Sequence, residues 1–436
     1  MTAPLGLFTP IRFHAVLPAA CDVVVVGGGV AGVMTAWHLA GQGQRVVLCE
    51  KGRVAAEQSS RNWGWVRQQG RDPAELPIMV ESLALWKQLA ADLGDGLGFR
   101  QTGVTYLART QKEQAGYAGW MRHATANGVD TRLLSRAEVD AMFPDHAAAW
   151  VGGMTTPSDA RAEPATAVPV LAQDAVRRGA VIVENCAVRG LDLAAGKVAG
   201  VMTEQGRIDC DQVVVAGGAW SSLFLRRFGV DIPQLSVRES VGVTGPVADF
   251  HSGAASDDRI ALRRRADGAY TVTPGAERDF YIGPDAFRHL RRFAGIAFNT
   301  LRATRFHARA PRGYPDAWST PRTWDMDRAS PFEAMRVLDP AASAPIMAHV
   351  QRDFAATFPG QGRPEWASTW AGMIDSMPDL LPVIDRVAAV PGLVIATGLS
   401  GHGFGLGPGL GRVVADLVTG RAVGHDLTAF RFARFA

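Results

Sequence analysis

No uncharged apolar stretch of this sequence reaches the roughly 18 residues that a membrane-spanning helix requires, so no transmembrane segment is predicted. The first 20 residues contain three prolines and lack the continuous apolar core of a signal peptide. A cytoplasmic location is therefore the expectation, and it leaves room for peripheral contact with a membrane surface.

Cysteine is also scarce. The four cysteines are scattered and form no CxxC pair, which leaves no recognisable metal site or disulfide framework. They are Cys21, Cys49, Cys186 and Cys210. Cys21 and Cys49 flank predicted strands and are interpreted as small core residues. The net charge of +3 is too small to indicate a nucleic-acid partner.

The length of 436 residues predicts two domains, with three as the alternative. An apolar content of 47% and a charged content of 20% are typical of an ordinary soluble globular protein.

Near the N-terminus, the order of elements is typical of a dinucleotide-binding unit. Val23 to Val26 predict a buried strand, Val30 to Leu39 predict a helix, and Val46 to Leu48 predict a second strand closed by Glu50. Three glycines in G-x-G-x-x-G spacing lie between the first strand and the helix: Gly27, Gly29 and Gly32.

Each residue type has a physical role in such a unit. Gly27 permits the tight turn, Gly29 lets the backbone approach a pyrophosphate, and Gly32 lets helix and strand pack closely. The helix N-terminus, with Val30 and Ala31, offers N–H groups to phosphates. Glu50 can accept hydrogen bonds from ribose hydroxyls and would repel a 2′-phosphate. The alternative is a glycine-rich turn with no ligand.

The segment 51–72 has little helical period and many polar and aromatic residues. It is expected to lie along the cofactor, because it follows the dinucleotide-binding unit directly. Its candidate cofactor contacts are Lys51, Ser59, Ser60, Arg61, Asn62, Gly64 and Trp65. Trp63, Arg67 and Gln68 are candidates for a pocket wall. The alternative is a surface loop with tryptophans packed beneath it.

Two later strands are expected to reach the same ligand. Gln212 to Gly218 predict a buried strand that ends in a glycine pair, and Leu393 to Thr397 predict another, followed by seven glycines before residue 412 and a helix. The candidate contacts on these segments, and on the predicted strand 187–191, are Val188, Ala216, Gly217, Trp220, Gly401, His402, Gly403, Phe404 and Gly405.

The remaining segments predict a second module. Alternating residues at 99–108 and from Val237 onwards predict strands, with a hairpin turn at Asp267-Gly268. Phe287 to Leu301 combine arginines with apolar residues at helical spacing, a pattern that suits contact with a membrane or a partner. A solvated face on the domain exterior is the commoner explanation of such a helix.

Together these residues resemble the D-amino-acid oxidase-like family of FAD enzymes, which includes glycine oxidase, sarcosine oxidase and D-amino-acid dehydrogenase. The resemblance extends from Cys21 to about Gly420. It implies an α/β fold with a discontinuous Rossmann-like FAD-binding domain and a substrate-binding domain on a mixed, largely antiparallel sheet. The expected FAD-binding segments are 20–98, 156–235 and 360–436, and the expected substrate-binding segments are 99–155 and 236–359.

The resemblance also implies an activity. FAD would oxidise an amine or amino acid by accepting hydride at N5 from the carbon that bears nitrogen, and the imine product would hydrolyse. The dipole of the C-terminal helix would stabilise negative charge at N1 and C2=O of the reduced ring. O2, a quinone or a partner protein would accept the electrons. Three alternatives are a dehydrogenase that uses a quinone or partner protein, a non-catalytic FAD-binding subunit, and a nicotinamide dehydrogenase.

Several positions depart from the family pattern. No cysteine lies near Trp370 to Met373, which implies non-covalent FAD. Gly405 stands where sarcosine oxidase-like enzymes carry a lysine, and Ile374 and Asp375 stand where glycine oxidase carries an Arg-Pro that grips the substrate carboxylate. The candidates for the catalytic site are therefore Arg67, Arg263, His402 and Asp375. For Asp375, contact with a cationic substrate group and a structural role in a turn are equally weighted.

Overall fold

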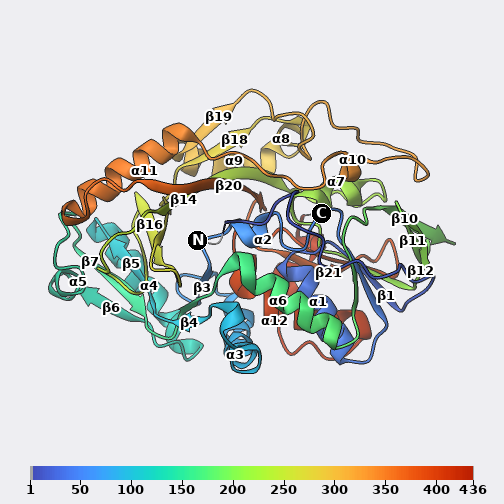
Figure 1. Ribbon diagram of the computed structural model, residues 1–436, viewed down its shortest axis with the longest axis horizontal. Helices are drawn as coiled ribbons and strands as arrows, with labels where there is room; N and C mark the ends of the chain where they lie inside the picture. The colour runs from blue at the N-terminus through green and yellow to red at the C-terminus, as the bar shows by residue number, and fades with distance from the viewer. Residues whose placement is uncertain (1–2, 436) are drawn as a thin grey trace.

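The computed structural model describes residues 3–435 and consists of two halves, each built on its own sheet (Figure 1). The first half contains a six-stranded sheet in the order β21-β22-β13-β1-β2-β9. Its strands pair in parallel except β21 with β22. They span Val23–Val26 (β1), Val46–Cys49 (β2), Val181–Val183 (β9), Gln212–Val215 (β13), Val383–Arg386 (β21) and Leu393–Thr397 (β22).

Helices cover one face of this sheet and a small β-meander covers the other. Val23 and Val25 of β1 pack toward the helices, whereas Val24 packs toward the meander, as strand alternation requires. The helices are α1 (Val30–Gly41), α3 (Leu76–Leu93), α6 (Pro164–Arg177) and α12 (Gly403–Thr419). The meander consists of β10 (Val188–Ala194), β11 (Lys197–Thr203) and β12 (Gly206–Asp209), with α7 (Ser221–Arg226) nearby.

The glycines of α12 explain how closely these helices pack. A Cβ on Gly407 would lie 2.4 Å from Val30, and one on Gly411 would lie 2.5 Å from the backbone of Met34. On the next face, a Cβ on Gly409 would lie 2.7 Å from the carbonyl oxygen of Ile78 in α3. The glycine-rich sequence therefore serves helix packing along α12, in addition to the turn that precedes it.

The second half contains a ten-stranded sheet in which β20 pairs along β14, outside the main order β19-β18-β14-β17-β16-β15-β5-β7-β6. Its pairs are antiparallel except β5 with β15 and β18 with β19. The strands span Val104–Ala108 (β5), Arg132–Ser135 (β6), Gly152–Thr156 (β7), Leu235–Thr244 (β14), Ala254–Ser256 (β15), Ile260–Arg264 (β16), Tyr270–Pro274 (β17), Arg278–Tyr281 (β18), Thr304–His307 (β19) and Trp366–Ser376 (β20).

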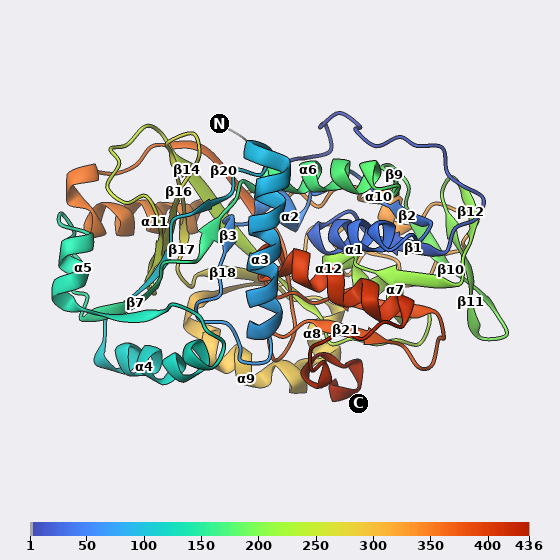
Figure 2. The same cartoon turned by 90° about the horizontal axis from the view of Figure 1, so that it is seen from below.

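The helices that pack against this sheet include α4 (Gln111–Ala126), α5 (Arg136–Met142) and α11 (Ala344–Thr357). Figure 2 shows α3 between the two halves, and a short sheet of β3 (Trp65–Val66), β8 (Ala160–Arg161) and β4 (Arg100–Gln101) joins them. The expected segment 360–436 contains β20, whose partner β14 lies in the ten-stranded sheet. The chain therefore returns to the six-stranded sheet after residue 376, with β21, and not at residue 360.

The predicted hairpin turn at Asp267-Gly268 is confirmed, since it joins β16 to β17. All four cysteines are buried and free. No helix in residues 3–435 has both the length and the apolar character needed to cross a membrane.

One predicted helix is wrong in its continuity. The segment 287–301 is divided at His289, which has non-helical backbone angles (φ −106°, ψ 14°). At this break the His289 side chain is buried, and its Nε2 lies 3.7 Å from Asp231 Oδ1. The resulting helices are α8 (Pro284–Arg288) and α9 (Leu290–Thr300).

Candidate active site

A cavity of about 700 Å³ lies between the two halves, which is within the range of ligand-binding cavities. At one end it reaches the carboxyl ends of β1 and β2, where Gly27 and Glu50 line it. At the other end it reaches the inner face of the ten-stranded sheet, where Arg278 lines it. An elongated ligand can therefore contact both halves at once.

In the glycine turn after β1, the backbone packs closely against the segment that follows β13. Gly27 has a positive φ of 109°, and a Cβ there would lie 2.5 Å from the carbonyl oxygen of Ala216. Gly32 does not line the cavity. A Cβ on Gly32 would lie 1.9 Å from the carbonyl oxygen of Gly27, so its role is the packing of α1 against the turn.

Glu50 holds this turn together. Its carboxylate accepts hydrogen bonds from the backbone N–H groups of Gly28 and Gly52, both at 2.7 Å. Burial raises the pKa of Glu50 to about 7, although Lys51 and these N–H groups favour the ionised form. Each carboxylate oxygen keeps a second lone pair, which suits acceptance of a ribose hydroxyl.

The segment around α2 (Gln58–Arg61) is largely held by its own contacts. Ser59 Oγ accepts a hydrogen bond from the N–H of Val30 at 2.9 Å, and Asn62 Oδ1 accepts one from Gly64 at 2.7 Å. Ser60 and Gly64 lie outside the cavity lining, whereas Ser59, Arg61, Asn62 and Trp65 contribute to it. The oxygen atoms of Ser59 and Asn62 thus accept hydrogen bonds from the protein backbone and fix the shape of the cavity wall.

Other expected cofactor contacts do line the cavity: Gly29, Val30, Ala31, Lys51, Val188, Ala216, Gly217, Trp220 and residues 401–405. Lys51 Nζ is already engaged, since it pairs with Glu57 at 2.6 Å and lies over the Trp220 ring. Trp65 Nε1, in contrast, is buried without a hydrogen-bond partner among residues 3–435. It is a donor available to a bound group.

The N-terminus of α12 meets the cavity at residues 401–405. Ser82 Oγ and Trp86 Nε1 of α3 donate hydrogen bonds to the carbonyl oxygen of Gly405, at 2.7 and 3.0 Å, and so fix this first turn. A Cβ on Gly405 would lie 3.3 Å from the carbonyl oxygen of Trp65. The tight contact with β3 is consistent with glycine, not lysine, at this position.

His402 is supported by a buried charged pair. Its Nδ1 lies 3.2 Å from Glu75 Oε2, and Arg71 lies 3.4 Å from the same oxygen. Burial opposes ionisation of Glu75, but His402 and Arg71 outweigh it and lower its pKa to about 2. Burial lowers the pKa of His402, and the negative charge of Glu75 opposes that shift. His402 also lines the cavity.

The inner face of the ten-stranded sheet carries two opposite charges. Strands β14 and β18 pair Arg238 with Asp279, which form a 2.9 Å ion pair on one face. Continuing this register places Glu239 opposite Arg278 on the other face, where both line the cavity. Within residues 3–435, Glu239 has no hydrogen-bond partner, and no carboxylate lies within 4.0 Å of Arg278.

These two groups influence each other through the cavity. Burial raises the pKa of Glu239, and the positive charge of Arg278 opposes that rise. Arg278 Nε donates a 3.3 Å hydrogen bond to the carbonyl oxygen of Ala276, which orients the guanidinium. A ligand with one cationic and one anionic group can complete both sites.

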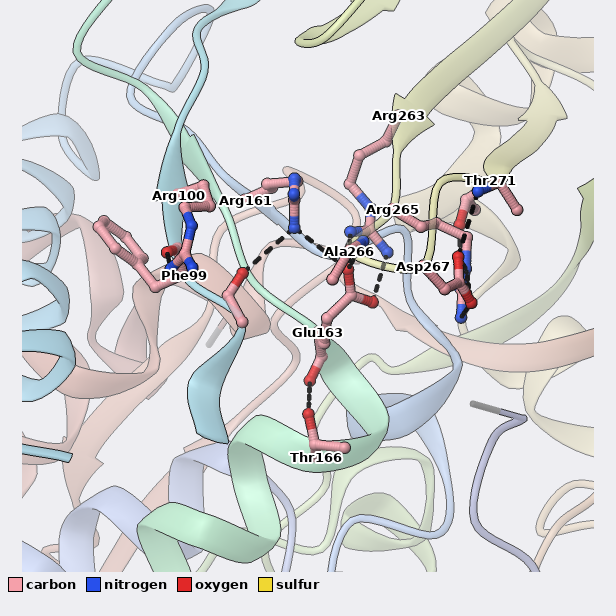
Figure 3. Close-up of polar contacts among 12 residues, drawn as sticks. Phe99, Arg100, Arg161, Glu163, Thr166, Arg263, Arg265, Ala266, Asp267 and Thr271 are labelled. Carbon is pink, nitrogen blue, oxygen red and sulfur yellow. Dashed lines mark hydrogen bonds and ion pairs between the residues drawn. The ribbon is translucent and has the colours of Figure 1, made fainter. Parts of the chain in front are cut away.

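The two arginines expected at the substrate lie in different places. Arg67 lines the cavity and stacks over Tyr106, 5.6 Å from the ring centre. Arg263 does not line the cavity, and the expectation that it anchors a substrate is corrected by its contacts. It is 1% exposed and its two Nη atoms donate to Glu163 at 2.8 and 3.2 Å (Figure 3).

Figure 3 shows Glu163 in the middle of a group of polar contacts. Glu163 lies at the N-terminus of α6, and Arg161 also pairs with it, at 3.2 Å. Because Glu163 belongs to the first half and Arg263 to β16, this buried ion cluster joins the two halves. Arg263 therefore has a structural partner that the sequence pattern did not reveal.

Asp375 is likewise committed to the fold. Its side chain is 1% exposed and accepts hydrogen bonds from Gly398 N at 2.9 Å and Gln234 Nε2 at 3.1 Å. Burial raises its pKa to about 6. These contacts tie β20 to the turn that follows β22, which favours the structural alternative over contact with a cationic substrate.

Sequence reasoning missed Glu239 and Arg278. Glu239 lies in β14 and Arg278 in β18, and in each strand the adjacent charged residue, Arg238 or Asp279, belongs to the opposite face. The distinguishing signal is the register between β14 and β18. It pairs Arg238 with Asp279 on one face and places Glu239 and Arg278 on the face that lines the cavity.

The comparison with protein families decides what this cavity holds. A family model described as DAO, FAD-dependent oxidoreductase, matches residues 22–417. The chain belongs to this family. The cofactor is therefore FAD, and the glycine turn, Glu50 and the α12 N-terminus fit it by their positions along one cavity.

The relatives of this flavoprotein include a sarcosine dehydrogenase and a glycine oxidase. Mouse mitochondrial sarcosine dehydrogenase is 31% identical over 273 residues, which cover 59% of this chain but only 30% of that protein. The chain thus spans less than a third of the length of that relative. Glycine oxidase from Geobacillus kaustophilus is 28% identical over 426 residues and is matched over 95% of this chain and 97% of its own length.

Among solved structures, L-amino acid deaminase from Proteus myxofaciens in complex with anthranilate has a TM-score of 0.92 and 30% sequence identity. The match covers 99% of this chain and 97% of that one. The fold is therefore that of a two-domain FAD enzyme, with a Rossmann-like domain and a second domain on a mixed sheet.

Proposed function

We propose that this flavoprotein oxidises an L-α-amino acid at the carbon that bears the nitrogen. The observation that carries the proposal is the unpaired placement of Glu239 and Arg278 on the inner face of the second sheet. The zwitterion of an α-amino acid presents an ammonium and a carboxylate on one carbon, and so complements both groups.

Arg278 would hold the substrate carboxylate. Its guanidinium presents a planar fork that matches a carboxylate, and no protein carboxylate within residues 3–435 competes for it at ion-pair distance. Arg67 is the other cationic candidate on the cavity wall. Its Nη1 already donates to the carbonyl oxygen of Gln69, which makes it the weaker candidate.

Glu239 would receive a proton from the substrate. Hydride leaves the carbon readily only when the nitrogen carries a lone pair, so the ammonium must first lose a proton. The ionised carboxylate of Glu239 can accept it, and burial raises the pKa of Glu239 toward the range that suits a general base. Bound FAD supplies the hydride acceptor. The resulting imine hydrolyses in water to a 2-oxo acid and ammonia.

The preference for L substrates rests on structural likeness. The L-amino acid deaminases from Proteus myxofaciens and Proteus vulgaris have TM-scores of 0.92 and 0.91 with this chain, at 30% and 28% identity. We also propose that FAD is held without a covalent bond. Of the four free cysteines, Cys49 lines the cavity, and it lies at the nucleotide end in β2.

A second candidate function concerns the electron acceptor. The similarity to sarcosine dehydrogenase favours transfer to a quinone or a partner protein instead of O2. A non-catalytic FAD-binding role is a third candidate, because one relative, the mouse mitochondrial pyruvate dehydrogenase phosphatase regulatory subunit, is named as a regulatory subunit and is 30% identical over 207 residues.

The products distinguish these functions. Purified holoprotein is incubated with matched L- and D-amino acids, with sarcosine and with the corresponding decarboxylated amines, and 2-oxo acid, ammonia and peroxide are measured. We expect one 2-oxo acid and one ammonia per L-amino acid consumed. Peroxide in equal amount indicates O2 as the acceptor, whereas turnover only with an added quinone indicates a dehydrogenase. Turnover of the decarboxylated amines alone would contradict the proposal.

A further inference from the structure

A basic surface with exposed apolar side chains surrounds α8 and α9. The segment 284–312 contains seven arginines and one acidic residue, Asp285. Asp285 is buried and paired with Arg226 at 2.9 Å and Arg288 at 3.4 Å. The surface that this segment presents is therefore strongly cationic, although the whole chain has a net charge of only +3.

The helix α9 turns its apolar stripe away from the protein. Its buried contact is Phe293, whereas Leu290, Phe298 and Leu301 are 62%, 82% and 56% exposed. Positions 290, 294, 298 and 301 recur at helical spacing and lie on one face. A surface helix of a globular protein normally buries its apolar stripe, so this orientation is the reverse of the usual one.

Neighbouring elements extend this apolar surface. Phe287 of α8 and Trp318 are 62% and 59% exposed and their rings lie 6.0 Å apart. Figure 2 shows α9 along the edge of the molecule, near the C-terminus. Arg292 contacts the Phe435 ring there, at 6.0 Å. We define the docking surface as α8, α9, Leu301, Arg302 and Trp318.

We propose that the docking surface binds the headgroup region of a membrane that contains anionic phospholipids. The exposed aromatic and leucine side chains would enter the interface, and the flanking arginines would contact lipid phosphates. Charge complementarity favours this occupant over a second copy of the chain, because two copies would bring the same arginines together. The surface lies close to the active site in sequence, since β18 begins at Arg278 and α8 follows it directly.

Vesicle co-sedimentation of the holoprotein tests this proposal. Vesicles of phosphatidylcholine alone are compared with vesicles that also contain phosphatidylglycerol. We expect binding to the anionic vesicles, weakened by salt, and little binding to the neutral ones. Replacing Arg291, Arg292 and Arg302 by Gln should weaken binding roughly 100-fold, at about fivefold per arginine.

Apolar variants provide the second arm. Phe298→Ser with Leu301→Ser should abolish vesicle binding, while the flavin spectrum and the activity toward soluble substrate remain unchanged. Phe8→Ser is the matched control, since Phe8 is 97% exposed in the N-terminal segment. Equal vesicle binding by the double variant would overturn the proposal. So would a concentration-dependent dimer that the double variant loses, because the surface would then bind a second copy.

Discussion

Replacement of Arg278 by Met provides a graded test of how the substrate is held. The variant keeps most of the side-chain volume and removes the fork that would bind the carboxylate. A hydrogen bond to a charged group contributes about 1.5–3 kcal/mol, which corresponds to roughly a 10- to 150-fold loss in kcat/KM for amino acids. Arg278→Lys should lie between wild type and Arg278→Met, because it keeps the charge without the fork.

The same variant should alter the pH profile. Arg278 favours the ionised form of Glu239, so its removal should raise the pKa of Glu239 further. If ionised Glu239 accepts the substrate proton, activity is lost as the pH falls through that pKa. The acid limb of kcat/KM should therefore move to higher pH in Arg278→Met. In Glu239→Gln this limb should disappear.

Steady-state kinetics with an L-amino acid and its decarboxylated amine is the assay. Arg67→Met compares the other cavity arginine, and Arg305→Met is the control, since Arg305 lies on the neighbouring strand β19 and is excluded from the cavity lining. An equal loss for both substrates, or a larger loss in Arg67→Met than in Arg278→Met, would refute the assignment of the carboxylate to Arg278.

Three further outcomes concern stability. Gly411→Ala should cost about 1–3 kcal/mol by overpacking, whereas Gly119→Ala, with open space around it on α4, should be neutral or stabilising in thermal unfolding. Glu163→Gln should cost about 3–5 kcal/mol by leaving Arg263 without its carboxylate, and adding Arg263→Met should recover part of this loss in urea titrations. The Glu75 pKa of about 2 lies below its ordinary value, so ionised Glu75 stabilises the fold above about pH 4.5 by on the order of 3 kcal/mol. The stability difference between wild type and Glu75→Gln should therefore shrink as pH falls from about 4.5 toward 2, and a constant difference would contradict this.

The nucleotide end of the site could be predicted from the sequence because its signals are local. Gly27 and Glu50 belong to one βαβ unit, in which the strand, the glycine turn, the helix and the second strand follow one another directly in the sequence. The same holds for the first turn of α12, where Leu393–Thr397 is followed at once by glycines. In each case, one strand and the helix after it carry the whole pattern.

The substrate end could not be predicted in this way, because it depends on pairing between distant segments. An arginine such as Arg263 can bind a substrate carboxylate. In the folded chain, however, the guanidinium of Arg263 is buried and hydrogen-bonded to Glu163, which lies 100 positions away in the sequence. Arg278 and Asp279 are adjacent in sequence, but strand alternation sends one to the cavity and the other to an ion pair with Arg238. Only the register of β14 with β18 assigns their roles.

The most direct test of amino-acid oxidation at this cavity is an anaerobic titration of the yellow holoprotein with one L-amino acid, its D-enantiomer and its decarboxylated amine. The visible flavin absorbance is the readout. We expect the L-amino acid to bleach it stoichiometrically, the other two to leave it largely unchanged, and Arg278→Met to slow the bleaching by roughly 10- to 150-fold. Bleaching by the decarboxylated amine as fast as by the amino acid would contradict recognition of a zwitterion by Glu239 and Arg278.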